Sequence, residues 1–213
     1  MKTLKQYIQE AIKRIPRNSG IIVFDIDDTL LKANPDVIKV YKTVDGKRIT
    51  LTTEQYAKDP DAGKHPKMFS FEDFHNPVKV YNSIISGTPL IKNLRIMEEY
   101  VKAGYDFCFL TARGAEETIK KAIKEFLKTN HTKKYPKALD ELEDAFKETF
   151  SHAINDAYKK YPGGTDAEKK ANVLKDLCKE YEKVVFVDDD KKNVRAARGL
   201  ELPNLKVIQA WDD

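Results

Sequence analysis

The most constraining feature of the sequence is an apolar run that leads directly into carboxylates, IIVFDIDDTL at residues 21–30. The β-branched and aromatic residues that follow Gly20 are typical of a buried strand in a parallel sheet. Asp25, Asp27, Asp28 and the hydroxyl of Thr29 come directly after it. Carboxylates about 4 Å apart at a partly buried site repel by roughly 4 kcal/mol per pair, so a cation must lie among them. The run therefore predicts a site for Mg²⁺ and phosphate.

Two further apolar strands are predicted, at residues 105–110 and 183–187, and polar groups follow each of them. The first leads into Thr111, and the second leads into Asp188 and Asp189. In an open parallel sheet, ligands bind outside the carboxyl ends of the strands, where the strand order reverses. We therefore expect the three strand ends to meet at one site.

Helices are predicted between these strands, and their alternation defines the fold class. The predicted helices cover residues 89–103, 115–128, 165–181 and 191–200, and a last strand covers residues 205–209. Strands alternating with helices predict an α/β fold: a three-layer, Rossmann-like parallel sheet with helices on both faces.

Residues 32–88 interrupt the alternation directly after the first strand. An Asp-Gly pair at residues 45–46 lies between strand-like flanks and predicts a hairpin over residues 40–51. An aromatic cluster follows at residues 69–74. Such a segment is too long for a plain connector, so we interpret it as a small cap inserted over the site. The predicted domains are a core of residues 1–31 and 89–213 and a cap of residues 32–88.

Two stretches are harder to interpret. Residues 136–160 have a helical pattern, although the alternation requires a strand in this part of the chain. Neither residues 130–135 nor residues 150–154 make a convincing strand, so the third core strand is left open. Residues 3–15 predict an amphipathic helix, either packed on the domain or, as the alternative, lying on a membrane surface.

Composition bounds the partners and the compartment. The first 20 residues hold five basic residues and one acidic residue, which account for the whole net charge of +4. The remainder is neutral, which does not favour a nucleic acid as the partner. No apolar run approaches the roughly 20 residues of a membrane span, and the charged start lacks the apolar stretch of a signal peptide. Cys108 and Cys178 lie in apolar stretches and suit free thiols, so we expect a cytoplasmic protein with no membrane segment.

The three strand ends together resemble motifs of the haloacid dehalogenase superfamily. The matching residues are Asp25, Asp27 and Thr29 for motif I, Thr111 for motif II, and Asp188, Asp189 and Asn193 for motif IV. The similarity covers residues 21–194, and the insertion lies where the first cap type of that family sits. Asn193 departs from the family pattern, in which an Asp is common at that position.

The family also requires a lysine, and the predicted helix at residues 165–181 offers two. At about 100° per residue, Lys170 lies near 60° within an apolar arc of about 140°, whereas Lys169 lies near its edge. A lysine centred on the apolar face should carry its charge along that face to the strand ends. Lys170 is therefore the predicted lysine, with Lys169 as the alternate.

The resemblance implies a Mg²⁺-dependent phosphohydrolase that cleaves a phosphomonoester. Asp25 would attack the phosphorus and form an aspartyl-phosphate, and Asp27 would serve as general acid and then as general base. The implied phosphate-binding groups are Thr111, the amide of Ala112 and Lys170, and the implied metal site comprises Asp25, the carbonyl of Asp27, Asp189, and Asp188 through an oriented water. Arg113 is a candidate for substrate contact, although an arginine that opens a helix lies as often on the surface.

A small phosphorylated substrate is the expected partner, and two alternatives stay open. One is a phosphatase that acts on nucleic-acid ends, such as a polynucleotide 3′-phosphatase. The other is a non-catalytic protein that binds Mg²⁺ or phosphate, which would have no need of the acid Asp27. A phosphorelay receiver also combines Asp, Thr and Lys, but it fits this length and insertion poorly. The physiological substrate and the oligomeric state are not indicated by the sequence.

Overall fold

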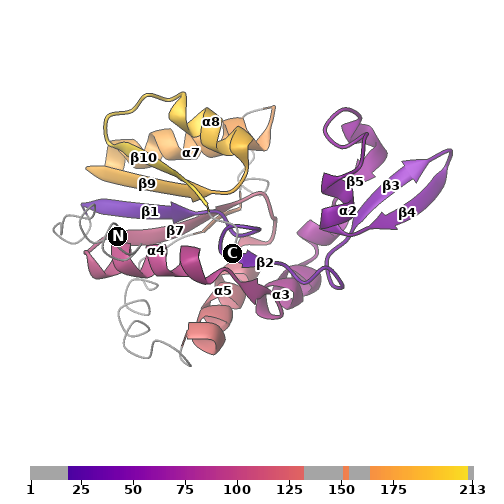
Figure 1. Ribbon diagram of the computed structural model, residues 1–213, viewed down its shortest axis with the longest axis horizontal. Coiled ribbons are helices and arrows are strands. Elements are labelled where there is room, and N and C mark those ends of the chain that lie inside the picture. The colour runs from indigo at the N-terminus through magenta and orange to yellow at the C-terminus, as the bar shows by residue number, and fades with distance from the viewer. Residues whose placement is uncertain (1–18, 132–150, 154–163, 211–213) are drawn as a thin grey trace, which may run out of the picture.

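A five-stranded parallel sheet forms the centre of the protein (Figure 1). The computed structural model describes residues 19–131, 151–153 and 164–210. In spatial order the strands are β10 (Leu205–Gln209), β9 (Lys183–Asp188), β1 (Gly20–Phe24), β7 (Asp106–Thr111) and β8 (Ser151–Ala153). The predicted α/β class with a parallel sheet is confirmed.

Helices cover both faces of this sheet and give the three layers that the alternation predicts (Figure 1). One layer contains α4 (Ile91–Lys102) and α5 (Glu116–His131), and the other contains α7 (Asp166–Glu180) and α8 (Lys191–Arg198). Successive residues of β1 face opposite layers, since Ile22 and Phe24 belong to the core cluster with α4 and α5, whereas Ile21 and Val23 pack with α7. Each such fully buried side chain contributes about 1.5–3 kcal/mol.

The register of the sheet brings the carboxyl ends of three strands to one edge. Phe24 at the end of β1 pairs with Phe109 on β7 and with Val187 on β9. The chain continues from β1 to β7 on one side and later to β9 on the other, so the strand order reverses at β1. The residues that follow Phe24 therefore lie at the topological switch point, where ligands of open α/β sheets bind.

The inserted segment, residues 32–88, is bracketed by a short antiparallel pair. Strand β2 (Leu31–Lys32) enters it and β6 (Thr88–Pro89) leaves it, and the two strands are hydrogen-bonded to each other. Between them a three-stranded sheet stands apart from the central layers, to the right in Figure 1. The strands of this sheet are β3 (Val40–Val44), β4 (Lys47–Leu51) and β5 (Phe69–Ser70). The short helices α2 (Thr53–Ala57), η1 (Pro66–Met68) and η2 (Glu72–His75) belong to the same segment.

The predicted hairpin over residues 40–51 is confirmed. Strands β3 and β4 pair antiparallel on both sides of Asp45 and Gly46. Both turn residues have positive φ, at 49° and 73°, as a two-residue type I′ turn requires.

The last helix of the inserted segment packs against the core. Helix α3 (Pro77–Ile85) begins after an Asn76 cap and lies against α5 (Figure 1). Its buried residues Val80 and Ile84 belong to the same core cluster as Phe24. Helix α3 therefore joins the inserted segment to the core, and the division into core and cap stays a prediction.

The third core strand, which the sequence left open, is β8. It pairs in parallel with residues 109–111 of β7 at the edge of the sheet. The helix predicted over residues 136–160 is therefore wrong at residues 151–153, and its other residues lie outside the described part of the chain. The amphipathic helix predicted over residues 3–15 also lies outside it. A three-residue edge strand is formed by pairing with its neighbour, so it has too little alternation of its own to be recognised.

Two other expectations concern the membrane and the thiols. Within the described ranges, no helix combines the length and the apolar character needed to cross a bilayer. Cys108 and Cys178 are free thiols, as predicted.

Candidate active site

Three carboxylates from two strand ends meet at the switch point. Asp25 directly follows β1, Asp188 ends β9 and Asp189 comes next, and ligand oxygens of the three lie within 4.8 Å of one another. The backbone N–H of Asp25 donates to the carbonyl of Val187 at 3.0 Å, which ties the start of the loop to β9. The structure thus brings together acids from the first and the last third of the chain, as their places at the carboxyl ends of parallel strands predict.

Lys170 reaches the centre of this acidic cluster from α7. Its Nζ donates to Asp25 Oδ1 at 2.7 Å and to Asp188 Oδ2 at 2.8 Å, and the residue is only 3% exposed. A capping box at Thr165 fixes where α7 begins, and hence which face Lys170 occupies. Lys169 instead pairs with the half-exposed Asp166 at 3.6 Å. Lys170, and not its neighbour, is therefore the lysine at the strand ends.

The electrostatics of the cluster show an excess of negative charge. Burial raises the pKa of Asp25, and Asp188 and Asp27 raise it further, although Lys170 acts in the opposite direction. Burial disfavours the charged form of Lys170, but the two carboxylates outweigh that cost and leave the pKa of Lys170 raised. Burial and the neighbouring Asp188 raise the pKa of Asp189 to about 7. One lysine is thus insufficient to neutralise three ionised carboxylates.

The donor set fits a hard divalent cation. Asp25, Asp188 and Asp189 offer carboxylate oxygens, which are the ligands that Mg²⁺ and Ca²⁺ prefer. A cation among them would supply the positive charge that Lys170 alone does not. The carboxylate of Asp27 is not part of this set, and its contact to a metal through the carbonyl stays a prediction.

The carboxylate of Asp188 is held by several donors besides Lys170. Asn193 Nδ2 donates to its two oxygens at 3.1 and 3.0 Å, and the N–H of Asp190 donates to Oδ1 at 2.9 Å. Asp190 is also the N-cap of α8, because its side chain accepts from the N–H of Lys192. At the position where the family commonly has an Asp, Asn193 supplies an N–H donor that an ionised carboxylate cannot supply.

Thr29 has a role that the sequence did not indicate beyond its place in the motif. Its hydroxyl donates to Asp189 Oδ1 at 3.0 Å and accepts from the N–H of Asp189 at 3.0 Å. The carbonyl of Thr29 in turn accepts from Asn93 Nδ2 on α4 at 2.9 Å, and both residues are fully buried. Thr29 therefore joins motif I to motif IV and orients the Asp189 carboxylate.

Asp27 is held by Arg113, a contact that the sequence did not predict. Arg113 Nε donates to Asp27 Oδ2 at 2.7 Å, and Nη2 donates to Oδ1 at 2.6 Å. Arg113 is 1% exposed, so the alternative of a surface arginine is wrong. Its backbone N–H donates to the hydroxyl of buried Thr111 at 3.2 Å, which places Thr111 and the following Ala112 at the same edge.

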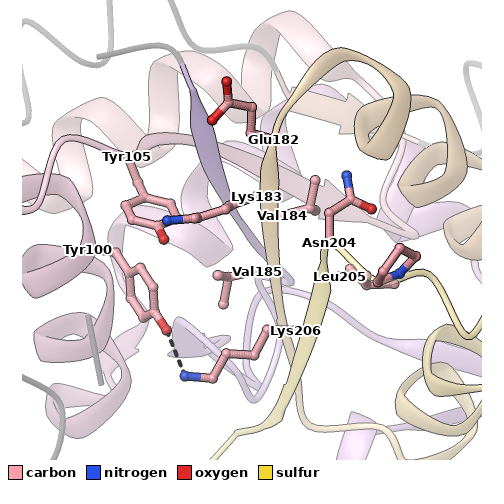
Figure 2. A pocket seen from close by; sticks show the side chains of 10 residues that line it. Tyr100, Tyr105, Glu182, Lys183, Val184, Val185, Asn204, Leu205 and Lys206 are labelled. Carbon is pink, nitrogen blue, oxygen red and sulfur yellow. Dashed lines mark hydrogen bonds between the residues drawn. The ribbon is translucent and has the colours of Figure 1, made fainter. Parts of the chain in front are cut away.

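A separate pocket lies at the opposite edge of the sheet, at the amino ends of β9 and β10 (Figure 2). It has a volume of about 420 Å³, and its lining includes Tyr100, Tyr105, Lys183 and Lys206. Lys206 Nζ donates to the hydroxyl of Tyr100 at 3.1 Å (Figure 2). None of the predicted site residues lines this pocket.

The fold and the site define a class: a Rossmann-like α/β protein with a carboxylate and lysine centre at the switch point of its sheet. A model of the haloacid dehalogenase-like hydrolase family matches residues 20–200. The chain therefore belongs to the haloacid dehalogenase-like hydrolases. No individual curated protein was found to match it.

Proposed function

We propose that the protein is a Mg²⁺-dependent phosphomonoesterase that acts through an aspartyl-phosphate on Asp25. The observation that carries this proposal is the pairing of Asp25 with Lys170 at 2.7 Å, with a second acid, Asp27, two residues further on. A carboxylate nucleophile beside a fixed cation and a separate proton carrier is the set of groups that covalent phosphoryl transfer requires.

In the first step, a carboxylate oxygen of Asp25 attacks the phosphorus and the ester P–O bond breaks. The proton of the Asp27 carboxyl group goes to the leaving alcohol oxygen. In the second step, Asp27 takes a proton from water while the water oxygen attacks the phosphorus. The bond between Asp25 and the phosphorus then breaks, which releases phosphate and restores both acids.

The remaining groups bind and orient the phosphoryl group. Lys170, the hydroxyl of Thr111 and the amide of Ala112 lie at the edge where the phosphoryl oxygens would sit, and they would offset the charge that develops on them. The metal would be held by Asp25, the Asp27 carbonyl and Asp189, with Asp188 orienting a bound water. When bound, Mg²⁺ supplies charge neutralisation for the phosphate and for the crowded carboxylates.

The test is release of inorganic phosphate from a panel of monoesters. We expect turnover of at least one small phosphorylated substrate, and a loss of at least about 100-fold when excess chelator removes the metal. Restoring millimolar Mg²⁺ should restore the rate, whereas the same concentration of Na⁺ should not. Full activity in excess chelator would contradict the proposal.

The same panel separates the alternatives. A 3′-phosphorylated oligonucleotide should be a poorer substrate than nucleoside monophosphates or sugar phosphates, because the chain beyond residue 20 carries no net charge to bind a phosphate backbone. A protein that binds Mg²⁺ but hydrolyses nothing would instead be a non-catalytic member of the family.

The free thiols of Cys108 and Cys178 are compatible with the cytoplasmic location expected from the sequence.

Thr29→Val tests the contact between motif I and motif IV. The substitution keeps the shape of the side chain but removes the hydroxyl that orients Asp189. Because groups that orient a metal ligand affect affinity by about 10–100-fold, we expect the Mg²⁺ concentration for half-maximal activity to rise about tenfold. Thr43→Val, at an exposed strand position of the inserted segment, is the matched control. An unchanged Mg²⁺ dependence in Thr29→Val would contradict the assigned role.

A further inference from the structure

We propose that Arg113 is the positioning residue of the general acid: it fixes the Asp27 carboxyl group, which in its protonated form gives its proton to the leaving group, and ties it to α3 of the inserted segment. This inference rests on the proposed function and extends it. The observation behind it is a two-pronged contact between a fully buried guanidinium and a carboxylate whose side chain is still 33% exposed. Asp27 is thus accessible from the site while its two oxygens are held by the buried Arg113.

The contact restrains the carboxylate in orientation as well as position. Nε and Nη2 of Arg113 each donate to a different oxygen of Asp27, at 2.7 and 2.6 Å. A bidentate arginine fixes the plane of a carboxylate, which a single lysine contact does not do. Asp27 lies in the loop after β1 and Arg113 follows β7, so the carboxyl group that moves the proton is held from another part of the chain.

Arg113 is itself fixed by the inserted segment. Its Nη1 donates to Ser83 Oγ on α3 at 2.7 Å, and the hydroxyl of Ser83 donates to the Val80 carbonyl at 2.9 Å. The ring of Phe74 lies 5.8 Å from the guanidinium carbon, and the carbonyl of Phe74 accepts from the N–H of Gly114 at 3.0 Å. The position of the general acid is therefore coupled to that of α3.

The test compares two esters whose leaving groups differ in how much they need an acid. Glycerol 2-phosphate has an alkoxide leaving group that must be protonated, whereas 2,4-dinitrophenyl phosphate has one that leaves unprotonated. Since kcat/KM reports the steps up to transfer of phosphate to Asp25, it isolates the step in which Asp27 gives its proton. For Arg113→Met we expect kcat/KM to fall about 100-fold for the alkyl ester and less than about fivefold for the aryl ester.

Two milder variants keep the inference testable if Arg113→Met does not fold. Arg113→Lys keeps the positive charge but loses the bidentate contact to Asp27. Ser83→Ala removes only the hydrogen bond between Arg113 and α3. We expect both to lower the ratio of alkyl to aryl kcat/KM, by about 3–10-fold. Arg48→Met is the control, because the exposed Arg48 pairs with Glu72 within the inserted segment and should leave the ratio unchanged.

The outcomes distinguish the positioning role of Arg113 from the proposed phosphomonoesterase function. A shift in the ratio supports the positioning role, because a merely structural role lowers both rates alike. Equal losses on the two esters in Arg113→Lys and Ser83→Ala would overturn the inference and leave the proposed function intact. A wild-type protein that hydrolyses neither ester would overturn both.

Discussion

Lys170→Met is expected to destabilise the protein by about 3–5 kcal/mol in metal-free buffer, because it leaves buried carboxylates without their cation. Lys170 Nζ now bridges Asp25 and Asp188, and all three groups are buried. For a chain of this length, the loss corresponds to a fall in the melting temperature on the order of 6–20 °C. Thermal unfolding followed by circular dichroism in the presence of chelator measures it.

Lys169→Met is the matched control for this prediction. It removes a neighbouring lysine from the same helix whose ammonium pairs with the half-exposed Asp166 at 3.6 Å, so the expected loss is smaller than that of Lys170→Met. Adding Asp188→Asn to Lys170→Met should recover part of the stability, because one of the uncompensated charges is then gone. Mg²⁺ should recover part of it as well. Equal melting temperatures for the Lys170→Met and Lys169→Met variants would contradict the proposed electrostatics.

Lys170→Met should also lower turnover, because this cation would offset the charge that develops on the phosphoryl group. With saturating Mg²⁺ and at a temperature where the variant is folded, we expect kcat to fall about 1000-fold. Lys169→Met should retain activity. Because the measurement is made on folded protein, the loss of rate is separated from the loss of stability.

The residues that sequence could predict are those whose positions follow from local periodicity. Strands β1, β7 and β9 are continuous apolar runs, and parallel pairing brings their carboxyl ends together whatever the intervening chain does. Lys170 was distinguished from its neighbour by helical phase alone, since one residue along a helix rotates a side chain by about 100°. Strands β1, β7 and β9 and the acidic cluster therefore follow from patterns shorter than about 20 residues.

The contacts that sequence did not reveal are those between distant segments. Arg113 and Asp27 are separated by 86 residues, and an arginine near the start of a helix shows no sign of its partner. Thr29 and Asp189 are 160 residues apart, and only the register of β1 against β9 brings them together. Strand β8 is too short to show alternation, so it is defined by its pairing with β7. In each case the information lies in tertiary packing.

Asp25→Asn is expected to abolish turnover, with a loss of at least about 10⁴-fold, because an amide oxygen is a poor nucleophile toward phosphorus. The fold should be retained, since Lys170 still pairs with Asp188 at 2.8 Å. Asp28→Asn is a matched control: Asp28 is exposed, and Asn tolerates its left-handed backbone. We expect Asp28→Asn to keep its rate within a few-fold, so that a loss specific to Asp25 reports the nucleophile and not the charge of the loop.

The covalent intermediate supplies a second, independent readout of the same residue. Wild-type protein quenched in acid during turnover of 2,4-dinitrophenyl phosphate should carry an acyl phosphate that hydroxylamine removes, and Asp25→Asn should carry none. Asp27→Asn should accumulate the acyl phosphate, since this ester needs no acid to form the intermediate but water still needs a base to cleave it. An acyl phosphate on Asp25→Asn, or turnover by that variant within tenfold of wild type, would show that another group attacks the phosphorus.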